Sequence, residues 1–327
     1  MPLRHPLRIA LLAPVGAIMC IPFKNDPSDA GEASAPDASV PVAESSAPGG
    51  GPPCSPDAGF GDPRLVAGLA DAATSIAAVR LSPDSLTAYF QAGGRPDSLG
   101  YDDIYTATRT DPASPFGHIA PLEGYEVNSP DDELYPTVSG DGLTLVFARS
   151  APIDPVFLWS TTRSEPSTSF DVPVLLAPPV NAMSAIYDTT PFLRQDGQVL
   201  YFASNRVPER GIDIYRVGWA GSSADAAFDA PAPVDELNAS SNELAPVVTP
   251  DDRTIYFASD RANGNGDFDI WTATRDSGAG FLAPTSVAEL NSDSVDIPTF
   301  ITGDGCTLYF SSARNGALLP YVATRGR

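Results

Sequence analysis

The chain of 327 residues is poor in several side chains on which enzymes depend for chemistry. It has 3 cysteines and 2 histidines, and Lys24 is its single lysine. Because His5 lies in an N-terminal leader, only His118 remains, which excludes a zinc site built from several histidines. A Ser-His-Asp triad would depend on His118, and P-loop or Schiff-base chemistry would depend on Lys24. Any catalysis would therefore have to rest on carboxylates.

Positive charge is also scarce, with 19 Lys and Arg residues against 41 Asp and Glu residues and a net charge of −22. This balance argues against nucleic acid and against anionic membrane surfaces as partners, because both are bound by clustered Lys and Arg. The simplest interpretation is a well-solvated surface. Hydrophobic residues make up 43% of the chain, enough for a core, while 34 prolines and 27 glycines predict many turns and few long helices.

Only one apolar run is notable, the eleven residues 9–19, and it is too short to span a bilayer, which takes about 20 residues. Together with the preceding arginines it predicts an export leader over residues 1–20. Two processing routes remain open. Cys20 would be the lipid-modified residue of a lipoprotein, although Met19 stands where a small residue is expected. Alternatively, signal peptidase would cut after residues 15–17. We favour lipidation of Cys20 because a tether-like segment follows.

That segment, residues 21–59, is rich in Pro, Ala, Ser, Gly and Asp and has few large apolar side chains. Such a composition buries too little surface to offset the entropy lost on ordering, so we expect a disordered linker. It would hold the remaining residues, 60–327, away from a membrane or simply trail from them.

A repeat dominates residues 60–327. An aromatic or apolar pair recurs at spacings of 57, 55, 55 and 53 residues, as Tyr89-Phe90, Val146-Phe147, Tyr201-Phe202, Tyr256-Phe257 and Tyr309-Phe310. Within the fourth copy, four short strand-forming segments are separated by turns, over residues 245–249, 254–259, 268–274 and 281–287. Four antiparallel strands repeated radially are typical of a β-propeller blade. We therefore predict an all-β protein with a single closed propeller of five four-stranded blades.

Ring closure is predicted from an offset in the repeat. The chain begins with an outer-strand motif at residues 60–66 and ends on an inner one at 321–324, so the N-terminal strand would complete the last blade and remove exposed sheet edges. A six-bladed ring with an unrecognised blade is the alternative. Closure also brings Cys54 near Cys306, which either form a disulfide in an oxidising compartment or remain two free thiols.

Several motifs resemble the WD40-like PD40 repeats of TolB-type propellers, namely Ser82-Pro83-Asp84, Ser139-Gly140-Asp141-Gly142, residues 256–261 and Asp269-Ile270-Trp271. The chain is also similar to predicted envelope lipoproteins of Gram-negative bacteria that carry five such repeats. The resemblance implies an extracytoplasmic location, in the periplasm or on the outer membrane. It says little about function, because propellers host many unrelated activities.

Four acidic residues precede the inner-strand prolines of successive repeats and are predicted to ring the mouth of the central channel: Glu133, Asp188, Glu243 and Asp296. Carboxylates from several blades could bind a cation or act as an acid–base pair on a sugar. The competing interpretation is structural, in which each acid caps the turn before its strand.

Two further patterns are expected to stabilise the blades. Arg206 with Asp213, and Arg261 with Asp269, are predicted to pair within their blades. The loop that carries Asn263, Asn265, Asp267 and Asp269 has the alternating oxygen side chains of a calcium loop, although it lacks the distal glutamate of an EF-hand and Asn-Gly is also common in turns.

These observations favour an exported envelope propeller that acts as a non-catalytic binding or scaffold module for a protein or a glycan. We expect it to be monomeric, to need no cofactor, with calcium as the exception, and to contact a membrane only through the N-terminal lipid. The alternatives are a carboxylate-based glycoside hydrolase and a lectin-like propeller. Trp159 and Trp271 do not favour the lectin, because they occupy the core position of Tyr105 and Tyr215.

Overall fold

The computed structural model describes residues 54–55, 58–70, 73–124, 126–150, 155–223, 225–276 and 279–326. All of them belong to the second of the chain's two units, Pro41–Arg327. The predicted leader, Cys20 and the linker up to residue 53 lie outside the described residues. Within the described part, the helical content is the single turn η1 (Pro208–Arg210), and none of it is long and apolar enough to cross a membrane.

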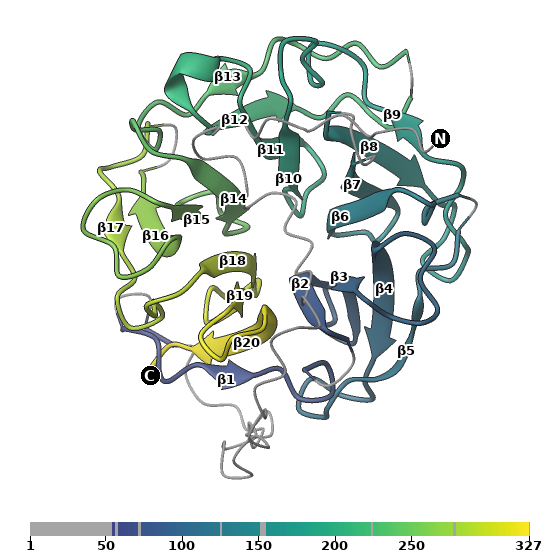
Figure 1. Ribbon diagram of the computed structural model, residues 1–327, viewed down its shortest axis with the longest axis horizontal. Coiled ribbons are helices and arrows are strands. Elements are labelled where there is room, and N and C mark those ends of the chain that lie inside the picture. The colour runs from purple at the N-terminus through teal and green to yellow at the C-terminus, as the bar shows by residue number, and fades with distance from the viewer. Residues whose placement is uncertain are drawn as a thin grey trace, which may run out of the picture. The chain divides into compact units, whose positions relative to one another are not determined.

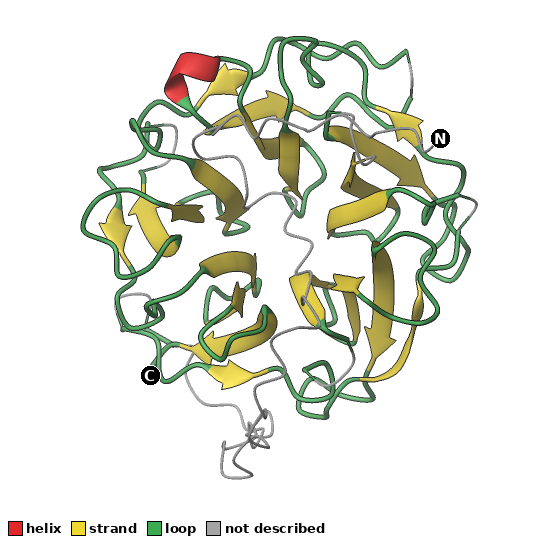
Figure 2. Ribbon diagram, in the orientation of Figure 1, coloured by secondary structure: helices red, strands yellow, loops and turns green. Residues whose placement is uncertain are grey.

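Twenty strands form five antiparallel sheets of four strands, arranged around a central axis (Figures 1 and 2). The first blade holds β2 (Ser75–Leu81), β3 (Thr87–Gly93), β4 (Asp102–Thr108) and β5 (Gly117–Pro121), and the second holds β6 (Asp132–Val138), β7 (Thr144–Ser150), β8 (Phe157–Thr162) and β9 (Val174–Leu175). The third comprises β10 (Asp188–Leu193), β11 (Val199–Ser204), β12 (Asp213–Gly218) and β13 (Ala232–Pro233). The fourth comprises β14 (Glu243–Val248), β15 (Thr254–Ser259), β16 (Asp269–Thr274) and β17 (Thr285–Ser286). The fifth is β18 (Asp296–Ile301), β19 (Thr307–Ser312), β20 (Leu319–Thr324) and β1 (Arg64–Leu65).

The fifth blade confirms the predicted closure. Its outer strand β1 comes from the start of the described chain and pairs with β20, with Arg64 opposite Val322 and Leu65 opposite Tyr321. In Figure 1 the purple β1 lies beside the yellow β20. The propeller therefore has five blades and not six, and its first and last strands close the ring in one sheet.

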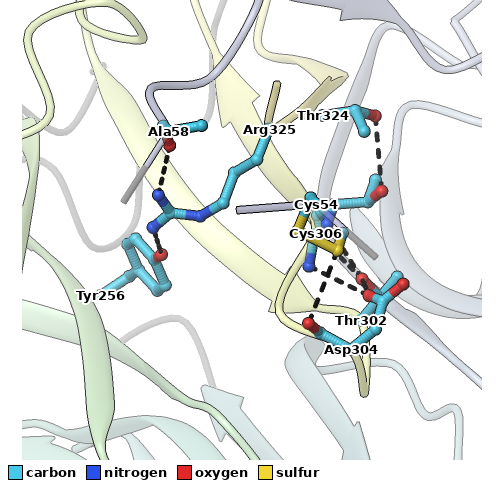
Figure 3. The surroundings of a disulfide bond; sticks show 9 residues. Cys54, Ala58, Tyr256, Thr302, Asp304, Cys306, Thr324 and Arg325 are labelled. Atoms are coloured by element: carbon cyan, nitrogen blue, oxygen red, sulfur yellow. Dashed lines mark hydrogen bonds between the residues drawn. A yellow bond between two sulfur atoms is a disulfide. The ribbon is translucent and has the colours of Figure 1, made fainter. Parts of the chain in front are cut away.

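A disulfide and an arginine reinforce this closure. Cys54 and Cys306 are bonded, with their Cα atoms 5.6 Å apart and a sequence separation of 252 (Figure 3). Nearby, the Arg325 guanidinium donates to the Ala58 carbonyl at 2.6 Å and to the Tyr256 hydroxyl at 2.5 Å. The N-terminal end of the described chain is thus attached to the last two blades by side chains as well as by strand pairing.

The repeated pairs of the sequence form the core. Their second members, on the second strand of each blade, are almost completely buried: Phe90, Phe147, Phe202, Phe257 and Phe310. Each lies opposite an aromatic residue of the third strand, such as Tyr105 opposite Phe90. Trp159 and Trp271 occupy this same position in their blades, as predicted, and Trp271 is only 8% exposed.

The innermost strands carry a bulge that joins neighbouring blades. Their pairing shifts register at the same place in each blade, and four of the bulged residues have positive φ: Ala78, Tyr135, Thr190 and Ala245. The bulge turns a backbone N–H out of the ladder. The N–H of Ala245 then donates to Thr190 Oγ1 at 3.0 Å, and that of Ala78 to Ser311 Oγ at 3.3 Å. These bonds link adjacent blades around the axis.

Candidate functional site

The four acids predicted at the channel mouth lie beneath the surface. Glu133, Asp188, Glu243 and Asp296 stand at the start of inner strands, and each is 0% exposed. Each accepts a hydrogen bond from a backbone N–H of the loop before its strand, which for Glu243 is that of Ala239 at 2.9 Å. These contacts are those of a turn cap, and they leave the carboxylates unavailable to a solute in the channel.

An arginine neutralises each of these acids, as the fourth blade illustrates. Arg261 Nη2 lies 3.1 Å from Glu243 Oε1 and donates to the Leu237 carbonyl at 2.6 Å. Its Nε donates to Ser259 Oγ at 3.0 Å, and its guanidinium lies 5.1 Å from the ring centroid of Trp271. The arginine thus links the entering loop, the first two strands and the core aromatic of one blade.

The same ion pair recurs in three other blades, as Arg149–Glu133 at 2.7 Å, Arg206–Asp188 at 2.9 Å and Arg314–Asp296 at 2.8 Å. The first blade departs from the pattern. In its inner strand β2, Ile76 occupies the position that holds the acid in the other blades. Ile76 lies opposite Ala92 of β3. An apolar pair therefore substitutes for the ion pair in one blade.

The arginine partners predicted from the sequence are wrong. Arg206 pairs with Asp188 and not with Asp213, which pairs with Arg210 at 2.8 Å. Likewise, Arg261 pairs with Glu243 and not with Asp269. Sequence spacing alone could not decide whether Arg206 pairs with Asp188 or with Asp213. Both acids lie directly opposite Ser204, one on each neighbouring strand.

The suspected calcium loop is organised around its last acid. Asp269 Oδ2 accepts from the backbone N–H groups of Asn265 at 2.6 Å and Gly266 at 3.2 Å, so this carboxylate folds the loop back on itself. Asn263 has a φ of +73°, which fits the turn chemistry of Asn-Gly. Among the described residues, no group of three or more His, Cys, Asp or Glu side chains is placed to hold a metal ion.

Asp102 is a buried carboxyl of a different kind. It is 8% exposed, and no described residue donates a hydrogen bond to its Oδ1. The pKa of Asp102 is raised to about 6, mainly by burial and less by the nearby Asp132 and Asp103, while a hydrogen bond with Gln91 opposes the shift. Because the folded pKa exceeds the unfolded value of 3.8, the native state holds this proton more tightly than the unfolded chain does.

We expect Asp102 to lower the free energy of unfolding as pH rises from 3.8 to about 6. The Asp102→Asn variant should lose this part of the pH dependence and be more stable than the wild type at pH 7 by about 1–2 kcal/mol. Thermal unfolding of both proteins at pH 4 and pH 7 measures the difference, with the exposed Asp229→Asn as control. A variant that is less stable than the wild type at pH 7 would contradict it.

Two joined loops with exposed apolar side chains lie where the inner strand of the third blade begins. Met183 is 89% exposed, Ile186 57% and Val207 39%. Their loops are joined, because Asn205 Oδ1 accepts from the backbone N–H of Ile186 at 2.9 Å and Ser184 Oγ donates to the Arg206 carbonyl at 3.4 Å. We call Met183, Ile186 and Val207 the blade-three patch.

A groove of about 470 Å³ lies between the first and last blades. At three other positions an arginine following the third strand reaches a tyrosine of the preceding blade: Arg163 to Tyr89, Arg275 to Tyr201 and Arg325 to Tyr256. Arg109 and Tyr309, the corresponding residues here, both line the groove, and among the described residues no such bond joins them. The groove is therefore open at a position where an Arg–Tyr bridge crosses three of the other four junctions.

No family model and no curated protein matches the chain. Solved structures are similar in fold. An α-L-arabinofuranosidase from Podospora anserina superposes with a TM-score of 0.51 at 10% identity, over 84% of this chain and 98% of that one. An endo-arabinase from Bacteroides thetaiotaomicron gives 0.50 at 15% identity, over 80% and 97%. TolB from Acinetobacter baumannii gives 0.41 at 14% identity over 77% of this chain, which spans 55% of that protein. At these identities the likeness shows the propeller fold alone.

Proposed function

We propose that this chain is an exported propeller of the cell envelope that binds a protein partner without catalysing a reaction. The observation that carries the proposal is the blade-three patch. Met183 is 89% exposed, and the two joined loops carry two further exposed apolar side chains, which are of the kind found at docking surfaces. Methionine also adapts its shape to a partner more readily than branched side chains do.

A loop of the first blade carries further exposed apolar side chains at the same end of the blades. Leu99 is 66% exposed and Tyr101 39%. The N–H of Tyr101 donates to Asp132 Oδ1 at 3.0 Å, so the loop between β3 and β4 lies where β6 begins, just as residues 205–207 lie where β10 begins. Tyrosine and exposed aliphatic groups at a shared end favour a protein partner over a phosphate-rich one, in keeping with the net charge of −22.

A glycoside hydrolase is the weaker alternative, although two of the similar structures are named as an α-L-arabinofuranosidase and an endo-arabinase. Hydrolysis needs two carboxyl groups that reach the scissile bond. The four repeated acids are fully buried and paired with arginines, which supports a structural role for them. A lectin-like role would need accessible aromatic platforms, and Trp271 is buried in its blade.

The disulfide between Cys54 and Cys306 supports an oxidising compartment, because such bonds persist mainly outside the cytoplasm. We therefore propose that the chain belongs with the PD40 envelope lipoproteins that its repeats resemble. Cys20 would carry the lipid, and the protein would be located in the periplasm or at the outer membrane of a Gram-negative bacterium. The linker would let a monomeric propeller reach its partner without further contact with the membrane.

Affinity capture tests the function. The full-length chain and its Met183→Asp variant are immobilised and exposed to an envelope extract of the cells that produce the protein. We expect a protein that the wild type retains and the variant loses at least tenfold, because a buried charge opposes docking. Leu282→Asp, at a 66% exposed position of another blade, is the matched control and should retain it. Equal retention by all three baits, or retention of glycan alone, would contradict the proposal.

A further inference from the structure

The central channel contains a buried arginine with no acidic partner. Arg80 follows the bulge of β2 and is 6% exposed. At the same register the other four inner strands carry neutral side chains, which are Thr137, Phe192, Val247 and Phe300. The first blade alone therefore places a cation at this level of the axis.

The contacts of Arg80 do not balance its charge. Its Nη2 donates to the Pro191 carbonyl at 3.5 Å, and its guanidinium carbon lies 4.7 Å from the ring centroid of Phe192. Among the described residues, nothing accepts a hydrogen bond from its Nε or Nη1. Burial lowers the pKa of Arg80 to about 9, so the guanidinium still carries its charge at neutral pH. A buried charge without a counter-charge is costly, and a buried unsatisfied donor calls for a bound ion or water.

Two small cavities of about 20 Å³ each adjoin Arg80. One of them is also lined by the hydroxyl-bearing residues Thr190, Thr299 and Ser311, and the described residues around it include no carboxylate. Thr299 Oγ1 is buried and has no hydrogen-bond partner in the described part of the chain. The hydroxyl oxygens of Thr190 and Ser311 accept hydrogen bonds from the backbone N–H groups of Ala245 and Ala78, respectively. Each hydroxyl group can therefore still donate its own hydrogen. The cavity is thus lined by donors beside a positive charge.

We propose that this cavity is a binding site for a small monovalent anion, of which chloride is the representative, held by Arg80 and the surrounding hydroxyl groups. The volume admits a single water-sized guest and therefore excludes phosphate, sulfate and sugars. The bound anion would supply the counter-charge that the blade-internal acids supply to Arg149, Arg206, Arg261 and Arg314. It would also contact residues from three blades, those of β2, β10 and β18, and so stabilise the centre of the ring.

Crystals of the full-length protein soaked in bromide test the site directly. We expect an anomalous difference peak within hydrogen-bond distance of Arg80 Nε or Nη1. Water-sized density at that position without anomalous signal would overturn the proposal. This arm uses the wild-type chain, so it does not depend on any variant folding.

Thermal unfolding at constant ionic strength provides a second arm. Gluconate is replaced by chloride at a concentration of about 100 times the Kd of chloride. The melting temperature of the wild type should then rise by about 5 °C, because a ligand that binds only the native state stabilises it. Arg80→Met should show no rise, whereas Arg216→Met, at an exposed position on β12, should respond like the wild type. An equal response of all three proteins would contradict the assignment to Arg80.

Discussion

Replacing Glu243 by leucine is expected to cost about 3–5 kcal/mol of the free energy of unfolding, because it leaves the Arg261 guanidinium beneath the surface without its counter-charge. Glu243 is fully buried and Arg261 is 15% exposed. The variant also removes the acceptor of the Ala239 N–H. The melting temperature should fall by about 10 °C, as measured by calorimetry or circular dichroism.

A double variant separates the ion pair from simple packing. Adding Arg261→Met to Glu243→Leu should restore much of the lost stability, because an apolar pair of similar volume avoids the desolvation of both charges. The first blade supports this expectation, since Ile76 and Ala92 stand there without any ion pair. The exposed Glu236→Leu, the matched control, should change stability by no more than about 0.5 kcal/mol. If the double variant lost as much free energy of unfolding as the two single variants lose together, Glu243 and Arg261 would not be coupled.

Removing the disulfide is expected to have an effect of similar size. The bond joins Cys54 to Cys306 across 252 residues, so it restricts a very long loop of the unfolded chain. The Cys54→Ser/Cys306→Ser variant should lose about 2–5 kcal/mol, with a fall of about 5–10 °C in the melting temperature. The hydrogen bonds of Arg325 and the pairing of β1 with β20 remain, so we expect the propeller still to fold.

Reductant provides the control for this prediction. Dithiothreitol should lower the melting temperature of the wild type to that of the double serine variant and leave the variant unchanged. If reductant had no effect on an intact disulfide-bonded sample at its melting temperature, the disulfide would not stabilise the closure.

The period of the repeat was sufficient to predict five blades, their strands and the closing strand at residues 60–66, because each copy places its apolar pair at the same point of a blade. The partners of the repeated arginines were not predictable in this way. Ser204 has an acid on each neighbouring strand, and only the path of the Arg206 side chain chooses between them.

Arg80 was missed for a related reason. The repeat already aligns Arg80 with Thr137 and Phe192, but only the structure shows that these three side chains line one cavity and that no acid accompanies the arginine there. A sign was nevertheless present in the sequence, since the arginine stands in the apolar segment directly before Ser82-Pro83-Asp84. The blade-three patch depends on two loops that meet in space, Met183–Ile186 and residues 205–207, and their contact has no periodic signal.

The most direct test of the binding role is hydrogen–deuterium exchange on the full-length chain with and without the captured protein partner. The proposal predicts slower exchange of the peptides that cover residues 182–187 and 205–207, with the inner strands unchanged. Protection confined to the groove beside Arg109 and Tyr309, or no protection of residues 182–187 and 205–207, would contradict it.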